Sequence, residues 1–405
     1  MPSSPQLTRH TGVISGLAFS PDGTTLATGS WDHSIQLWDF TLRTHITTLR
    51  GQSNEVWSVA FSPGQSIAGG GKDGSLKLWP ARQPDATNTI PGHWQPLAIN
   101  GDGKQLASVN REGTVGFFDL KSLKQTRSIT LPNKDAKKDS THRHSRSSQA
   151  VAISADLKTL VQGLRDGSVA ILDTESRERT SLSVSTSRPS FVALSPDAHY
   201  LVAGGRRQPL TVWDLHKSNS TEPIATIDGE RALFSQTGET MIIFSERGKE
   251  VEVWDATSMT FRDKFVISPR PGYGVALTPD GGILATTANI GDFNNAVSLW
   301  DTSSGELLGE CIGHKQGVWS IAFAPDGKSL ASSSDDGTLK FWNVATQQEM
   351  LSIRQVGTTL THLTFSPDGQ WLVSSKDPFS TSGELQMLRA PSFGEIEMWL
   401  SPDKN

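Results

Sequence analysis

Residues 313–343 read GHKQGVWSIAFAPDGKSLASSSDDGTLKFWN, and residues 9–39 repeat the pattern as RHTGVISGLAFSPDGTTLATGSWDHSIQLWD. In both stretches a His precedes a Trp by 28 residues, with three apolar runs and a Pro-Asp-Gly turn between them. Short runs that alternate apolar and polar residues between turn residues are typical of antiparallel strands. Each stretch is therefore predicted to form one small sheet, and its copies along the chain decide the fold.

The unit recurs along nearly the whole chain, at steps of 39 to 54 residues. Its copies are predicted to end near residues 39, 80, 119, 173, 214, 255, 301, 343 and 389. Trp-Asp closes the unit at 38–39, 213–214, 254–255 and 300–301. A period of roughly 40–45 residues with this ending resembles the WD-repeat β-propeller family. The resemblance implies an all-β ring of four-stranded blades over residues 1–390. We expect nine blades, with eight as the alternative.

The two ends of the chain and one insertion depart from the repeat. The resemblance implies that a strand at residues 6–9 completes the last blade, because an open ring would leave an unpaired sheet edge. Residues 391–405 are predicted to form a short helical tail, since Ser392 and Glu395 have capping-box spacing. The segment 121–149 carries eight Lys or Arg against two Asp and is predicted to be a basic loop insertion. The closing APS…EI segment resembles bacterial members of the family.

Composition excludes several classes of protein. Hydrophobic residues make up 35% of the 405 residues, which is enough for a packed core and too much for a disordered chain. The single cysteine, Cys311, excludes an internal disulfide framework. The first residues lack an apolar leader, and no run approaches the ~18 apolar residues of a spanning helix. We therefore expect a cytoplasmic protein that forms a monomeric ring and has no membrane partner.

Polar residues at fixed positions in two repeats contain the groups of a catalytic triad. The resemblance instead implies a buried structural hydrogen-bond chain, and repetition around a ring argues against a single active site. The two sets are His10, Thr28, Asp32 and Trp38, and His314, Ser332, Asp336 and Trp342. GGGKDG at 69–74 matches a dinucleotide motif but stands between two strands, and no His or Cys spacing indicates a metal. We expect no cofactor, no metal and no enzyme activity, with a propeller hydrolase as an alternative.

When the copies of the repeat are aligned with one another, cations occupy one position in five of them. This position lies just before the Asp that precedes the third strand. This column holds Lys72, Arg111, Arg165, Arg206 and Arg247, and Arg207 adds another cation. On one rim they would attract acidic groups, although each could equally pair with a nearby carboxylate. The resemblance implies that four aromatic residues border the face where partners of the family usually bind: Trp31, Trp57, Tyr273 and Trp319. They either anchor a partner or pack locally. We expect a protein-interaction scaffold for an acidic partner or a peptide, with nucleic-acid binding as the alternative.

Overall fold

The computed structural model describes most of the repeat region. The described residues are 9–20, 23–40, 44–49, 54–61, 66–72, 76–80, 88–91, 94–110, 112–131, 150–184, 188–205, 208–217, 222–245, 249–267, 271–288, 295–354, 360–376 and 384–390. Every regular element within these ranges is a β-strand, so the all-β prediction is confirmed. The helical tail predicted for 391–405 lies outside the described residues.

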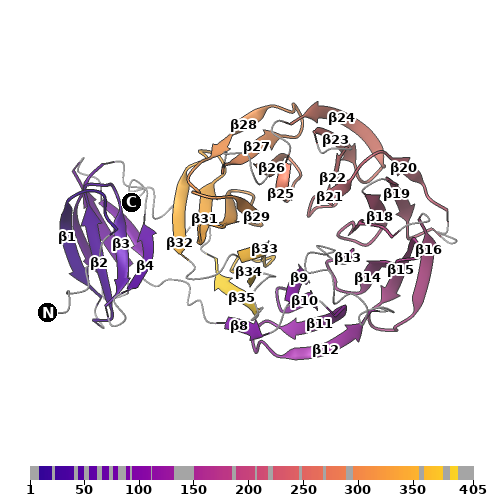
Figure 1. Cartoon of the computed structure of the whole chain (residues 1–405), viewed down its shortest axis with the longest axis horizontal. Helices are drawn as coiled ribbons and strands as arrows, with labels where there is room; N and C mark the ends of the chain where they lie inside the picture. The colour runs from indigo at the N-terminus through magenta and orange to yellow at the C-terminus, as the bar shows by residue number, and fades with distance from the viewer. Residues whose placement is uncertain are drawn as a thin grey trace, which may run out of the picture.

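Most of the strands form a ring of small antiparallel sheets (Figure 1). Its first three sheets contain β9 (Trp94–Ile99), β10 (Gln105–Asn110), β11 (Thr114–Asp119) and β12 (Gln125–Thr130); β13 (Val151–Ile153), β14 (Thr159–Gly163), β15 (Ser168–Asp173) and β16 (Arg179–Ser183); and β17 (Phe191–Leu194), β18 (Tyr200–Gly205), β19 (Gln208–Asp214) and β20 (Ala225–Ile227). In each sheet the strands follow one another in sequence order, as the three apolar runs and the following outer strand predict.

The ring continues with three more sets of four strands. These are β21 (Arg231–Phe234), β22 (Thr240–Phe244), β23 (Glu250–Asp255) and β24 (Thr260–Val266); β25 (Pro271–Leu277), β26 (Ile283–Ala288), β27 (Val297–Asp301) and β28 (Leu307–Cys311); and β29 (Val318–Phe323), β30 (Ser329–Ser334), β31 (Thr338–Asn343) and β32 (Glu349–Arg354). The Pro-Asp-Gly turn between β29 and β30 needs a glycine because Gly327 has φ of 67°, and its N–H donates to Ala324 O at 2.9 Å.

The last ring sheet combines strands from distant parts of the chain. It contains β33 (Leu360–Phe365), β34 (Trp371–Lys376), β35 (Glu384–Arg389) and β8 (Asn88–Pro91). Leu385 pairs with Ile90 and Gln386 with Thr89, so β8 closes the ring. The prediction that residues 6–9 complete the last blade is therefore wrong. Either strand would satisfy the edge of β35, and the structure uses the one that directly precedes β9.

The blade count also differs from the prediction. Six separate four-stranded sheets and the set β29–β32 make up the ring, whose first strands β9, β13, β17, β21, β25, β29 and β33 neighbour one another around its axis. The nine-blade prediction is wrong, and the eight-blade alternative is not supported. The first two repeats lie outside the ring because β8 closes it without them.

These two repeats form a two-repeat unit, defined here as β1–β7. It contains β1 (Ile14–Phe19), β2 (Thr25–Ser30), β3 (Ile35–Asp39), β4 (Thr44–Leu49), β5 (Val56–Phe61), β6 (Ser66–Gly71) and β7 (Leu76–Pro80). Strand β4 pairs antiparallel with β32, so β1–β4 and β29–β32 make one eight-stranded sheet. Strands β5–β7 form a three-stranded sheet that lies against β1 and β2.

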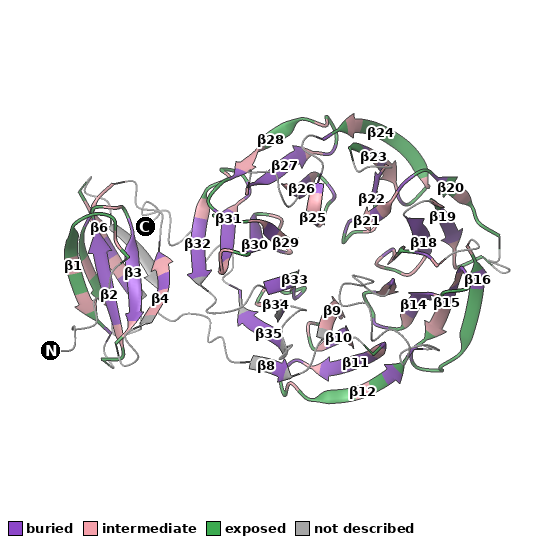
Figure 2. Cartoon of the chain, in the orientation of Figure 1, coloured by how far each residue is buried: buried purple, intermediate pink, exposed green. Residues whose placement is uncertain are grey.

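Apolar side chains fill the space between neighbouring sheets. Figure 2 shows the middle strands of each sheet mostly buried and several outer strands, such as β12 and β24, mostly exposed. A typical layer joins Ala285 and Leu299 of one repeat to Ile321 and Phe323 of the next. Each repeat therefore needs its neighbours for a core, as expected of stacked repeats.

The basic insertion is shorter than predicted. Residues 125–130 form β12, the outer strand of the first ring sheet, and Arg127 stacks over Phe117 with its guanidinium carbon 3.9 Å from the ring centroid. The loop prediction for 121–149 is therefore wrong at 125–130, where the outer strand of the repeat falls. Residues 132–149 lie outside the described residues.

Candidate interaction surface

The polar groups of the repeat ending at 343 form a continuous buried chain. Trp342 Nε1 donates to Ser332 Oγ at 2.7 Å, and His314 Nε2 lies 2.7 Å from the same oxygen. His314 Nδ1 lies 3.1 Å from Asp336 Oδ2. Burial alone would raise the pKa of Asp336. Hydrogen bonds from His314, Thr338 and the Lys315 N–H outweigh burial and hold that pKa below its usual value.

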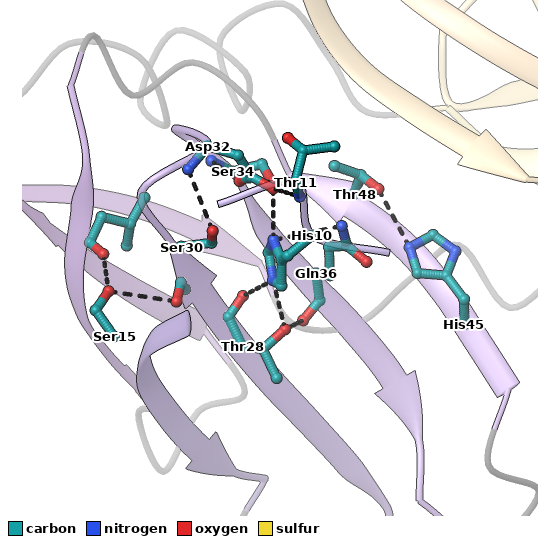
Figure 3. Close-up of polar contacts among 12 residues, drawn as sticks. His10, Thr11, Ser15, Thr28, Ser30, Asp32, Ser34, Gln36, His45 and Thr48 are labelled. Atoms are coloured by element: carbon teal, nitrogen blue, oxygen red, sulfur yellow. Dashed lines mark hydrogen bonds and ion pairs between the residues drawn. The ribbon is translucent and has the colours of Figure 1, made fainter. Parts of the chain in front are cut away.

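The first repeat contains the same chain outside the ring (Figure 3). His10 Nδ1 lies 2.8 Å from Asp32 Oδ2, and His10 Nε2 lies 2.8 Å from Thr28 Oγ1. Trp38 Nε1 donates to Thr28 Oγ1 at 2.9 Å. Ser34 Oγ donates to Asp32 Oδ1 at 2.6 Å, which orients the carboxylate from the far side. The four residues predicted to act together are thus joined in space in both repeats.

These groups form no usable nucleophile. Ser332 is 0% exposed, and its Oγ already lies within hydrogen-bond distance of both Trp342 and His314. Thr28 is also buried and is held in the same way. A nucleophile must reach a substrate atom, and these hydroxyls face neighbouring strands instead. Their chemistry is that of a satisfied polar network that ties two neighbouring strands to the turn between them and to the segment before the first strand.

The predicted column of cations is divided by the fold. Lys72 follows β6 in the two-repeat unit, whereas Arg165 lies in the turn between β14 and β15 of the ring. Lys72 Nζ lies 3.1 Å from Glu55 Oε1, so its charge is partly offset. The column therefore does not run along one uninterrupted ring. The other four predicted cations lie outside the described residues: Arg111, Arg206, Arg207 and Arg247.

Arg188 is a cation that the column did not include. It precedes β17, and Pro189 beside it packs against Gly163 at the end of β14, where an added Cβ would lie 3.2 Å from Pro189 O. Burial lowers the pKa of Arg188, and the positive charge of Arg165 lowers it further. Two guanidinium groups from adjoining blades are thus close enough to repel. No repeated pattern in the sequence points to Arg188, because the same position holds Val13, Glu55 and Gly317 in other repeats.

The four predicted aromatic residues also belong to two separate regions. Trp31 and Trp57 are exposed and lie in the two-repeat unit. Trp57 Nε1 donates to Glu55 Oε2 at 3.1 Å, and this bond and the bond from Lys72 lower the pKa of Glu55. Trp319 is partly buried on β29 of the ring, and Tyr273 lies on β25. The aromatic residues therefore do not form one patch beside the ring cations.

No group of three or more His, Cys, Asp or Glu side chains could hold a metal ion among the described residues. Within the same ranges, no helix is long and apolar enough to span a membrane.

Comparison with known proteins identifies the repeat. The model of the WD domain, G-beta repeat, matches residues 3–39, 43–80, 305–343 and 353–379. The chain is similar to the protein LST8 homolog of Drosophila melanogaster, with 28% identity over 40% of this chain and 52% of the relative. Protein tipD of Dictyostelium discoideum is 24% identical over 62% of this chain and 41% of the relative. Small ribosomal subunit protein RACK1y of Oryza sativa subsp. japonica is 44% identical over 17% of this chain and 22% of the relative.

The matches thus span about half of these relatives' length at most. All three relatives are eukaryotic, so they give no support to the bacterial type expected from the closing segment. The matched repeats include both repeats of the two-repeat unit and the repeat that contains β29–β31 of the ring. The repeat motif, these relatives and the ring of four-stranded sheets show that the chain belongs to the WD-repeat β-propeller family.

Proposed function

We propose that this protein is a non-enzymatic scaffold that binds an acidic segment of a protein partner at the ring end that carries Arg165 and Arg188. Matched WD-repeat proteins such as the LST8 homolog and RACK1y belong to a family that typically acts as protein-interaction scaffolds. The observation that supports the proposal is the placement of two arginines at the same end of adjoining blades, Arg165 in the turn between β14 and β15 and Arg188 just before β17. The positive charge of Arg165 also contributes to the lowered pKa of Arg188. The cytoplasmic location expected from the sequence stays a prediction.

An acidic ligand would relieve this repulsion. Each of the two guanidinium groups can donate paired hydrogen bonds to a carboxylate, and such charge-assisted bonds are stronger than neutral ones. Asp166, the neighbour of Arg165, is already engaged, because Ser168 Oγ donates to its Oδ1 at 2.6 Å. The hydrogen bond from Ser168 lowers the pKa of Asp166, which keeps this carboxylate charged and fixed in the turn.

The proposal favours a peptide over a nucleic acid. The sequence contains no element typical of sequence-specific RNA or DNA recognition, and nucleic-acid affinity through phosphates alone requires many cations. A hydrolase has no observation in its favour, since the candidate hydroxyls are buried. Nucleic-acid binding is therefore kept as an outcome of the experiment that follows.

The test measures binding of a fluorescein-labelled Glu-rich peptide to the full chain by fluorescence anisotropy. The double variant Arg165→Glu/Arg188→Glu is expected to weaken binding at least ~10-fold at low salt, since it removes two charge-assisted contacts and adds repulsion. The matched control is Lys104→Glu/Lys158→Glu, which makes the same change of charge. Lys104 and Lys158 precede β10 and β14, in the first turn of each repeat, so they lie at the opposite end of the sheets from Arg165.

The control variant should bind the peptide as the native protein does. Equal affinity of the Arg165/Arg188 variant and the native chain would disprove the proposed surface. A labelled single-stranded RNA should bind more weakly than the peptide. Tighter RNA binding that depends on the two arginines would replace the peptide proposal with nucleic-acid binding.

A further inference from the structure

We infer that the two-repeat unit forms an interface with the same unit of a second copy of this chain. Each repeat has a leading face, defined here as the side of its sheet that packs on the preceding repeat. Its other side, the trailing face, packs on the following repeat. In the ring every leading face meets a trailing face. Among the described strands, no sheet packs before the first repeat and no ring sheet packs after the second.

The leading face of the first repeat is open, although its residues match those of a covered one. Ile14, Leu17 and Phe19 on β1 are 45%, 65% and 50% exposed. The residues at the same repeat positions on β29 are Val318, Ile321 and Phe323, with exposures of 4%, 5% and 5%. Figure 2 shows β1 largely exposed at the edge of the molecule. The equivalent residues Leu360, Leu363 and Phe365 on β33 are buried as well, and Val59 and Phe61 of the second repeat are half-buried against the first. The exposed face of β1 thus has the chemistry of a repeat interface.

The first repeat extends its open face beyond β1. Phe40 is 50% exposed, whereas its equivalent Val344 is buried. Phe19 and Phe40 meet edge to face with centroids 4.7 Å apart, so they form one apolar ridge. An exposed cluster of large apolar side chains marks an interaction site more often than single exposed residues do.

The trailing face of the second repeat is open as well. Ala68 on β6 is partly exposed, whereas its equivalent Ala331 on β30 is fully buried against the next repeat. Ser58 on β5 is exposed. Its equivalent Ser320 accepts a hydrogen bond from the N–H of Leu363 in the following repeat, at 2.9 Å. Each copy of the chain thus presents both halves of the interface that holds the ring together.

Contacts within the chain show how the two halves meet. The residue equivalent to Ser320 in one repeat contacts the residue equivalent to Ile321 in the following repeat. Three pairs of neighbouring repeats show this contact. Ser320 bonds to Leu363, an added Cβ at Gly274 would lie 3.3 Å from Ile321, and an added Cβ at Gly16 would lie 3.0 Å from Val59 N. In the two-repeat unit, Leu17 on the leading face is equivalent to Ile321, and Ser58 on the trailing face is equivalent to Ser320. Neither of these side chains faces a neighbouring repeat of the unit.

A second copy of the chain fits these two open faces better than an unrelated protein does. Its trailing face complements the leading face of the first copy, and its leading face complements the trailing face. Leu17 of each copy would contact Ser58 of the other. Two units related by a two-fold axis then form a closed set of four sheets, which is the lower end of the range for propellers. Closure stops assembly at the dimer. The sequence-based expectation of a monomeric ring stays a prediction, and the dimer proposed here is its alternative.

Sedimentation equilibrium of the full chain tests the dimer. The expected mass is twice the 43.8 kDa of one chain. Leu17→Glu should weaken dimerisation about 10-fold or more, because it buries an unpaired charge in the interface. The control Val266→Glu changes an equally exposed residue on the outer strand β24 and should leave the mass unchanged. A native chain that stays monomeric at all concentrations would overturn the inference.

Cysteine cross-linking tests the register independently of the dissociation constant. The double variant Leu17→Cys/Ser58→Cys should form a covalent dimer on oxidation, since disulfide formation needs Cβ atoms about 3.5–4.5 Å apart. Each single variant should stay uncross-linked, and the native Cys311 is buried and does not interfere. Cross-linking of Leu17→Cys alone would show two leading faces in contact and overturn the proposed arrangement. A ladder of larger species would overturn closure.

Discussion

Ser332→Ala tests whether the buried polar chain contributes to the stability of the ring. The hydroxyl of Ser332 serves two buried groups at once, because Trp342 Nε1 donates to it and His314 Nε2 lies 2.7 Å from it. Trp342 is fully buried and His314 is buried, so neither group can turn to water. Removal of the hydroxyl leaves both unsatisfied. At about 1–3 kcal/mol for each of the two groups, the free energy of unfolding should fall by about 2–6 kcal/mol.

Urea unfolding followed by tryptophan fluorescence measures this loss, with Ser333→Ala as the matched control. Ser333 is the next residue on β30 and equally buried, but its Oγ makes only a 3.5 Å contact with Ser320 O. Its removal should cost less than about 1 kcal/mol. Equal losses of stability in both variants, or unfolding of Ser332→Ala at the native midpoint, would show that Trp342 and His314 do not depend on the Ser332 hydroxyl.

Three further predictions concern the closing strand, the buried carboxylate and the thiol. Ile90→Ala should lower the free energy of unfolding by about 2–5 kcal/mol in urea, because Ile90 is buried where β8 closes the ring, whereas Ile312→Ala at an exposed site should not. The pKa of Asp336 is below its unfolded value of 3.8, so its stabilisation should be present above pH ~4 and be lost as the pH falls further. Melting temperatures of Asp336→Asn should therefore depend less on pH in that range. Burial raises the pKa of Cys311 to about 12, so a thiol reagent should label it only after unfolding; rapid labelling of the native chain would contradict this.

The sequence predicts the strands and turns well because these depend on local pattern. The apolar runs of residues 313–343 become β29, β30 and β31, and the Pro-Asp-Gly turn has its glycine in the left-handed region. The polar chain follows for the same reason, since strand register sets the distance from His314 to Ser332 and Asp336. Interactions within one repeat are thus readable from its residues.

The number of blades cannot be read in this way. Every repeat offers similar leading and trailing faces, so a ring could close after different numbers of repeats. The outcome depends on which outer strand pairs with β35, and residues 88–91 look like an ordinary fourth strand of the second repeat. The error in the number of blades also affected the predicted row of cations. Lys72 and Arg165 occupy the same position in their repeats, but Lys72 belongs to the two-repeat unit outside the ring.

The connection between unit and ring determines what a partner could contact. Strand β4 pairs with β32 through Thr47, Thr48 and Leu49, and Thr47 Oγ1 donates to Ser352 O at 2.6 Å. Apolar side chains continue through this connection, since Leu49 and Ile353 belong to one core cluster. Pairing also removes two exposed sheet edges that would otherwise invite other strands.

A shared sheet and core resist bending more than a flexible linker would. The exposed Trp31 and Trp57 therefore stay at a fixed distance from the ring arginines. A partner that used both regions would have to extend from the unit across β32 to the ring end, and a short peptide could engage only one of them. Charge reversal at Arg165 and Arg188 and substitution of Trp57 should consequently have independent effects on any short ligand, and coupled effects only on a long one.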